Sequence, residues 1–249
     1  MPLLIAMKRN LFQLGSLFMT FLLSLSCLVS YAAALEVAES RYGSANNEET
    51  SLFEELADNP DFVEIKESPL VTIDLRYATE NNFVGTNLYG SFNRCYLHKE
   101  AAKKLKTASE HLEKGRPGWK LLIFDCLRPR SVQKILFERV KGTQYESYVA
   151  NPKKGSVHNY GFAVDLSLQD EKGREVDMGT PFDSFSRLSH PHMEKEFLRV
   201  GKLSREQVAN RLILRDSMEK SGFVQLSIEW WHYDALPSRQ VRKKYQIVE

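Results

Sequence analysis

Three segments of the chain repeat their apolar residues with the period of an α-helix, and each is followed by a glycine. The first helix is predicted over about Leu97–Lys114, and the second runs from just after Pro129 to Lys141. The third begins at Ser204, which has the spacing of a capping box with Gln207. The positions expected to face inward in the first two helices are Ala101, Leu105, Ala108, Leu112, Val132, Ile135, Leu136 and Val140.

Three apolar segments have the length of strands. Lys120–Asp125 is a short apolar run, and Phe162–Leu168 alternates apolar and polar residues as a half-buried strand does. Phe223–Tyr233 is rich in Trp, Ile and Val and is predicted to form a final strand. Because helices and strands are mixed without regular βαβ alternation, the pattern predicts an α+β fold.

Residues 1–34 have the layout of a secretory signal peptide. Lys8 and Arg9 precede an uncharged run over Leu11–Val29, and three small residues, Ala32-Ala33-Ala34, follow it. The alternative is a membrane anchor retained through residues 11–29, but the serines, the glycine and the glutamine within that run weaken a membrane span. We therefore expect an exported protein, periplasmic once the leader is removed.

The region after the leader is acidic and polar up to about residue 60, which predicts a flexible tether over residues 35–60. The alternation typical of a folded domain begins near Phe62, so one folded domain is expected over residues 61–249.

Composition excludes several classes of protein. The 249 residues are 43% hydrophobic and 27% charged, which fits neither wholesale disorder nor a polytopic membrane protein. Lys and Arg number 34 against 32 Asp and Glu, and this near-neutral balance disfavours a nucleic-acid partner. Beyond the leader only Cys95 and Cys126 remain, and they form either one disulfide or two separate buried thiols.

Two short segments contain the residues with catalytic potential, Ser156–Asp165 and Ile228–Tyr233. His158, Asp165 and His232 would make a three-ligand zinc site with a fourth position left for water. A nearby carboxylate can take the proton of that water, and Glu229 is a candidate for this role. The plainer alternative is an exposed aspartate and two packed histidines.

The spacing of these residues sets conditions on the backbone. On a regular strand Glu229 and His232 would point to opposite faces, so the strand must bend, bulge or end between them. His158 and Asp165 also need a break between them, for which Gly161 is the plausible place. Arg128, at the end of a predicted strand, could hold an oxyanion, although a lone arginine is by default solvated or paired with a carboxylate.

Together these motifs resemble the zinc D-alanyl-D-alanine dipeptidases of the vancomycin-resistance type. The resemblance rests on Ser-x-His-x-x-Gly-x-Ala-x-Asp at residues 156–165 and Glu-Trp-Trp-His at residues 229–232. Further segments fall in the family's order between about Asp74 and Tyr233: Asp74-Leu-Arg-Tyr77-Ala-Thr, Asp125-x-x-Arg128-Pro129 and Met178-Gly179-x-x-Phe182-Asp183. The resemblance implies a hedgehog-like α+β fold of the zinc DD-peptidase group.

The resemblance also implies a role for each candidate residue. His158, Asp165 and His232 would hold one zinc ion per chain, Glu229 would activate the metal-bound water, and Arg128 would stabilise the oxyanion. Asp183 would receive the ammonium of a small dipeptide, and Ser156 and Tyr77 would line its pocket. The implied reaction is the hydrolysis of D-alanyl-D-alanine to two D-alanines. The alternatives are a periplasmic D,D-carboxypeptidase or endopeptidase on peptidoglycan stem peptides, and a non-catalytic peptidoglycan-binding zinc module.

Other histidines and aromatic residues are expected to have structural roles. His190 and His192 are interpreted as loop residues, while His98 and His111 are interpreted as surface or boundary residues of the first helix. Trp230, Trp231 and Tyr233 are expected in the core and the pocket wall. Cys126 lacks the partners of a catalytic nucleophile.

Overall fold

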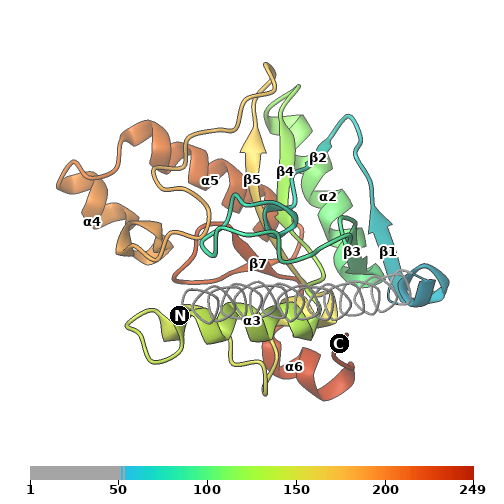
Figure 1. The fold of residues 1–249 in the computed structure, drawn as a ribbon. Helices are drawn as coiled ribbons and strands as arrows, with labels where there is room; N and C mark the ends of the chain where they lie inside the picture. Colours follow the sequence, from blue (N-terminus) through green and yellow to red (C-terminus); the bar gives the residue numbers. More distant parts are fainter. Residues whose placement is uncertain (1–51, 53) are drawn as a thin grey trace, which may run out of the picture. The chain divides into compact units, whose positions relative to one another are not determined.

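The computed structural model describes residue 52 and residues 54–249 (Figure 1). The predicted leader and most of the predicted tether lie outside these residues, so both stay predictions. Within the described part of the chain, no helix has the length and apolar character needed to cross a membrane.

The centre of the fold is a five-stranded sheet with the strand order β2-β4-β5-β7-β6 (Figure 1). Its strands are β2 (Val71–Ile73), β4 (Lys120–Asp125), β5 (Ala163–Gln169), β6 (Val224–Gln225) and β7 (His232–Asp234). Only the β2–β4 pair is parallel among the pairings described in this sheet. A separate antiparallel ribbon pairs β1 (Phe62–Ile65) with β3 (Cys95–His98).

Helices accompany the sheet, so the α+β class predicted from the pattern is confirmed. The α-helices are α2 (Lys99–Gly115), α3 (Arg130–Val140), α4 (Glu194–Arg199), α5 (Arg205–Glu219) and α6 (Ser238–Lys244). Short 3₁₀ turns lie at Arg76–Ala78, Glu146–Tyr148, Val157–Tyr160, Arg187–Ser189 and Pro191–Met193. Helices α2 and α5 pack on each other beside the sheet, whereas α3 and α6 lie together at the lower edge of the view in Figure 1.

The capping and core predictions hold at most positions. Ser204 accepts a hydrogen bond from the backbone N–H of Gln207, so α5 begins at the predicted capping box. The prediction for Ile135 is wrong, because this side chain is 48% exposed. Gln133 is buried on α3 instead, since it bonds the guanidinium of Arg128 and the carbonyl of Ala150.

The prediction for His98 is also wrong. The segment before α2 is strand β3, which pairs with β1 and carries His98 into the interior, where its side chain is 4% exposed. Its ring stacks on Phe162 with the centroids 4.3 Å apart, and its Nδ1 accepts a hydrogen bond from the N–H of Glu100. His98 therefore caps α2 and belongs to the core.

The predicted final strand is interrupted. Strand β6 ends at Gln225 and β7 begins only at His232. The residues between them form a turn in which the N–H of Leu226 bonds the carbonyl of His232. Trp230, Trp231 and Tyr233 are buried as expected. The prediction of a continuous strand over residues 223–233 is therefore wrong. The break includes Glu229 and ends at His232, so it meets the condition that the strand be interrupted between these two residues.

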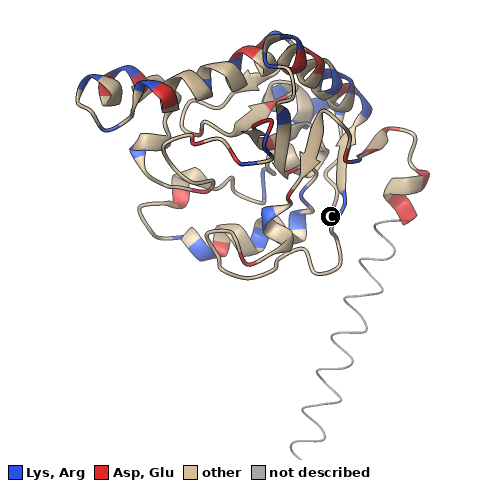
Figure 2. Cartoon of the chain, turned by 90° about the horizontal axis from the view of Figure 1, so that it is seen from above, with Lys and Arg blue, Asp and Glu red and all other residues tan. Residues whose placement is uncertain are grey.

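Charges of both signs alternate over the outer helices in Figure 2. Pairs such as Lys106–Glu110 and Lys220–Asp216 are spaced four residues apart on helix surfaces.

Candidate active site

Three neighbouring strands align polar residues in one row at the end of the sheet. In the register of β4, β5 and β7, Asp125 lies opposite Asp165, and Asp165 lies opposite His232. These residues are nearly inaccessible to solvent. The sheet thus brings together residues that are more than 100 positions apart in the sequence.

His158 reaches the same point from a 3₁₀ turn that precedes β5. The hydroxyl of Ser156 caps this turn by accepting from the N–H of His158, and Gly161 ends it at φ +70°. A Cβ at Gly161 would lie 2.9 Å from the backbone nitrogen of His98, so only glycine fits here. Gly161 is therefore the predicted break between His158 and Asp165.

The three predicted metal ligands converge on one point. His158 Nε2 lies 3.2 Å from Asp165 Oδ1 and 3.1 Å from His232 Nδ1, and His232 Nδ1 lies 3.0 Å from Asp165 Oδ1. Zinc with tetrahedral bonds of 2.0–2.1 Å holds its N and O ligands about 3.3 Å apart. The spacing of the three atoms is close to that of one face of such a tetrahedron.

The outer hydrogen bonds of the two imidazoles fix which nitrogen of each ring faces the centre as a lone pair. His158 Nδ1 lies 2.7 Å from the carbonyl oxygen of Cys126, which can only accept, so this nitrogen carries the proton. His232 Nε2 lies 2.9 Å from the carboxylate of Asp234 and donates to it. When both rings are neutral, as metal ligands must be, two lone pairs and a carboxylate oxygen face one another without a hydrogen between them. This donor set fits a cation such as zinc.

The third member of the group, Asp165, carries a negative charge. Burial opposes the charged form of this carboxyl, but His158 and His232 bring its pKa well below the ordinary range. Asp165 is consequently a carboxylate at neutral pH. Among the residues that the structure describes, these three form the group of His, Cys, Asp and Glu side chains spaced to hold a metal ion.

Glu229 lies on the turn between β6 and β7, beside the three ligands. Its Oε2 is 4.0 Å from His232 Nδ1, and the side chain is largely buried. Burial, reinforced by the charges of Asp165 and Asp183, raises the pKa of Glu229 to about 8, although His232 opposes this shift. A carboxyl of this kind is suited to exchanging protons near neutral pH.

Arg128 is held rigidly at the edge of the site. Its Nε donates to Asp125 Oδ2 at 2.8 Å, and its Nη1 donates to Gln133 Oε1 at 2.9 Å. The guanidinium carbon lies 4.8 Å from the ring centroid of Tyr77, and Nη2 is 3.4 Å from Asp165. The position of the positive charge is therefore fixed before any ligand arrives.

Asp183 and Tyr77 are hydrogen-bonded to each other, and Tyr77 also contacts the Arg128 guanidinium. The hydroxyl of Tyr77 donates to Asp183 Oδ1 at 2.9 Å, and Asp183 adopts φ +60°, which is unfavourable for a residue with a side chain. Burial and the charge of Asp165 raise the pKa of Asp183 to about 7, against the lowering effects of Tyr77 and Arg128. The strained backbone turns this carboxyl into the pocket.

All eight residues singled out from the sequence line one hollow of about 230 Å³. They are Tyr77, Arg128, Ser156, His158, Asp165, Asp183, Glu229 and His232. Their proximity is thus a feature of the structure, while the individual roles stay predictions. His190 and His192 lie elsewhere and bond Tyr148 and the carbonyl of Ser227, so they act as loop residues.

Comparison with known proteins identifies the family. The sequence pattern of the D-ala-D-ala dipeptidase family matches residues 61–248. The chain belongs to this family. It is 34% identical over 166 residues to the D-alanyl-D-alanine dipeptidase of Escherichia coli (strain K12), covering 67% of this chain and 79% of that relative. It is 33% identical over 177 residues to the D-alanyl-D-alanine dipeptidase of Enterococcus faecium, covering 64% and 83% respectively.

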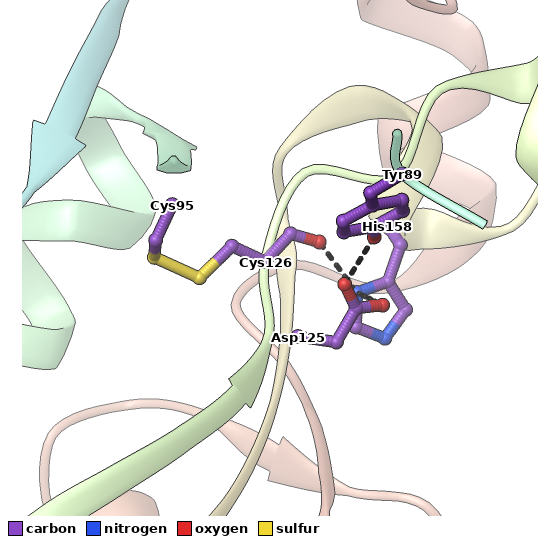
Figure 3. The surroundings of a disulfide bond; sticks show 5 residues. All are labelled: Tyr89, Cys95, Asp125, Cys126 and His158. Carbon is purple, nitrogen blue, oxygen red and sulfur yellow. Dashed lines mark hydrogen bonds and ion pairs between the residues drawn. A yellow bond between two sulfur atoms is a disulfide. The ribbon is translucent and has the colours of Figure 1, made fainter. Parts of the chain in front are cut away.

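A disulfide adjoins the end of this dipeptidase-family fold that carries the predicted metal ligands (Figure 3). Cys95 and Cys126 are bonded to each other, which decides between the two states that the sequence left open. Cys126 supplies the carbonyl that accepts from His158, and Asp125 beside it accepts from the buried hydroxyl of Tyr89. The disulfide thus joins β3 to the segment that supports both His158 and Arg128.

Sequence reasoning assigned no role to several supporting residues of the site. Asp125 and Gln133 fix Arg128, and Asp234 orients His232. Asp234 could have been found, because residues two apart on a strand share a face and an acid is a common partner of a metal-ligating histidine. Gln133 had no such signal, since a glutamine on a helix is ordinarily exposed.

Proposed function

We propose that this member of the dipeptidase family is a zinc-dependent enzyme that hydrolyses D-alanyl-D-alanine to two D-alanines. The observation that carries the proposal is the convergence of His158 Nε2, Asp165 Oδ1 and His232 Nδ1, with the carboxyl of Glu229 beside them. The outer acceptors hold the proton of each neutral imidazole, so the inner lone pairs are available to a metal cation.

Zinc bound by these three residues would act as a Lewis acid and lower the pKa of water. Glu229 accepts a proton from the attacking water and returns it to the nitrogen of the departing D-alanine. Its burial keeps bulk water from competing for that proton, and its raised pKa makes the return favourable. Glu229 therefore serves as base and then as acid.

Arg128 stabilises the negative charge that develops on the peptide oxygen. Its Nε and one Nη1 hydrogen are used by Asp125 and Gln133, which leaves a second Nη1 hydrogen for an oxyanion. Because the guanidinium is already stacked on Tyr77, little reorganisation is needed in the transition state.

Asp183 binds the free ammonium of the dipeptide, and Tyr77 holds that carboxylate in place. A pocket of about 230 Å³ with an acid for the amine suits a very short substrate. Peptides whose amine is blocked would leave Asp183 buried without a cation, which is unfavourable. Ser156 lines the same pocket and contributes to its polar wall.

Export to the periplasm is part of the proposal. It is supported by the signal-like sequence of residues 1–34 and by the Cys95–Cys126 disulfide, a bond that persists mainly in oxidising compartments. The substrate would then be dipeptide present outside the cytoplasm.

Metal reconstitution tests the proposal. The protein is stripped with a chelator, reloaded with graded zinc, and assayed for D-alanine release from D-alanyl-D-alanine. We expect activity to rise in step with bound zinc and to reach its plateau at one ion per chain. Full activity in the stripped protein would overturn the zinc dependence, and bound zinc without any D-alanine release would favour a binding module.

A further inference from the structure

Helix α6 places a second arginine on the wall of the active-site pocket. Arg242 lines the same hollow as Asp183, Glu229 and the three predicted ligands. Its Nε donates to the carbonyl of Lys154 and its Nη2 to the carbonyl of Gly155, both at 3.0 Å. The guanidinium is thus tied to the loop that leads into Ser156 and His158.

The charge of Arg242 is not compensated by an acid. The other arginine on the pocket wall, Arg128, is paired with buried Asp125. Among the described residues, no carboxylate oxygen lies within 4.0 Å of the Arg242 guanidinium, and its hydrogen-bond partners are two neutral carbonyls. The pocket wall also carries the acids Asp183 and Glu229. Arg242 is therefore able to pair its positive charge with an anionic group that enters the pocket.

The hydrogen bonds of Arg242 leave its Nη1 hydrogens unused. Nε and one Nη2 hydrogen are taken by carbonyls, so the edge formed by Nη1 and Nη2 can still offer two parallel N–H groups. Two parallel donors are the geometry that binds a carboxylate in bidentate fashion. Gly155 adopts φ +73°, a left-handed conformation that favours glycine, and a Cβ at this position would lie 2.8 Å from Ile247 Cδ1.

Arg242 lies at the boundary between two hollows. With Val149 and Ala150, this arginine also lines a second hollow of about 540 Å³, next to Phe137 of α3 and residues 143–155. A charged group at this boundary can define where the substrate ends, because a free carboxylate is present only at the end of a peptide.

We propose that Arg242 is a specificity-determining residue that binds the substrate's terminal carboxylate. The proposal rests on the proposed dipeptidase function. It assigns the two charged ends of a zwitterionic dipeptide to two residues, the ammonium to Asp183 and the carboxylate to Arg242. The carboxylate contact exists before and during the reaction, so its loss weakens binding more than turnover.

The test compares substrates with and without the carboxylate. Zinc-loaded wild type, Arg242→Met, Arg242→Lys and the control Arg239→Met are assayed on D-alanyl-D-alanine and on its C-terminal amide. Arg239 is an exposed arginine of the same helix that does not line the pocket. Thermal unfolding and zinc content are measured for every variant. Calorimetric binding of the dipeptide to Glu229→Gln, with and without Arg242→Met, gives a readout that does not depend on turnover.

We expect Arg242→Met to raise the KM for the dipeptide by about tenfold or more, with a smaller change in kcat. For the amide, the kcat/KM of Arg242→Met should stay within about twofold of wild type. The KM of Arg242→Lys for the dipeptide should lie between those of wild type and Arg242→Met. When Arg242→Met is added to Glu229→Gln, the affinity for the dipeptide should fall by a similar factor. Equal losses on both substrates with a lower melting temperature would overturn the proposal and leave Arg242 as a clasp between α6 and the 154–155 loop. Turnover absent in wild type, with dipeptide binding still dependent on Arg242, would overturn only the proposed function.

Discussion

The Nδ1 of His158 donates a 2.7 Å hydrogen bond to the backbone carbonyl of Cys126, whose sulfur is bonded to Cys95 (Figure 3). This contact fixes the ring so that Nε2 faces Asp165 and His232. The covalent cross-link therefore supports the backbone group that orients a predicted metal ligand. It connects the stability of the fold directly to the geometry of the site.

Removing the disulfide should weaken both stability and zinc binding. The bond closes a separation of 31 residues, so Cys95→Ala/Cys126→Ala should lose about 3–4 kcal/mol of unfolding free energy. Zinc affinity, measured by competition with a chelating dye, should fall by about tenfold or more because the support of His158 relaxes. Leu112→Ala, a buried change in α2, is the matched control: it should lower stability by about 2–5 kcal/mol without changing zinc affinity. Unchanged zinc affinity in the cysteine double variant would contradict this link.

Replacing a predicted ligand should remove the metal. Asp165→Asn keeps the shape of the side chain but removes the charge that balances the cation, so zinc content measured by elemental analysis should fall well below one ion per chain. Asp170→Asn, an exchange on the exposed turn after β5, should retain full zinc. Full occupancy in Asp165→Asn would exclude this carboxylate as a ligand.

Glu229→Gln should separate metal binding from catalysis. The amide is isosteric but cannot take a proton, so kcat for D-alanyl-D-alanine should fall by about 10²- to 10⁴-fold while zinc content stays at the wild-type value. Glu219→Gln, at the exposed end of α5, should leave kcat unchanged. Activity close to wild type in Glu229→Gln would assign proton transfer to another group.

The pH dependence of substrate binding should report Asp183. Only its carboxylate attracts an ammonium, and burial with the charge of Asp165 raises its pKa to about 7. As the pH falls below about 7 this charge is lost, so kcat/KM for the free dipeptide should fall by up to about tenfold per pH unit. Asp183→Asn should raise KM and remove the part of the pH profile that depends on this group. A profile identical to that of wild type would show that Asp183 does not receive the ammonium.

The sequence predicted those parts of the site that depend on residue type and left open those that depend on tertiary contacts. His158, Asp165 and His232 could be selected because their side chains suit one metal, and Gly161 could be placed as the break. The turn that carries Glu229 was predicted as strand, since its two tryptophans and isoleucine favour that conformation locally. Tertiary packing of Trp230 and Trp231 outweighs that preference.

Two further differences have the same physical origin. Gln133 replaces Ile135 on the buried face of α3 because Arg128 needs an acceptor there, and periodicity cannot detect a need of this kind. Similarly, His98 lies in the core because β3 pairs with β1, and the paired residues are 30 to 36 positions apart in the sequence. The sequence does not predict that Arg242 lines the pocket, because nothing in the sequence distinguishes it from the neighbouring basic residues of α6.

The most direct test of the account compares D-alanine release from three substrates by the zinc-loaded protein. The substrates are D-alanyl-D-alanine, its N-acetylated form and a peptidoglycan stem pentapeptide, with Glu229→Gln as the inactive control. The account predicts cleavage of the free dipeptide with kcat/KM at least about 10²-fold above the other two, because only the free dipeptide supplies an ammonium to Asp183. Equal or better cleavage of the acetylated or longer substrates would contradict it and indicate a D,D-carboxypeptidase.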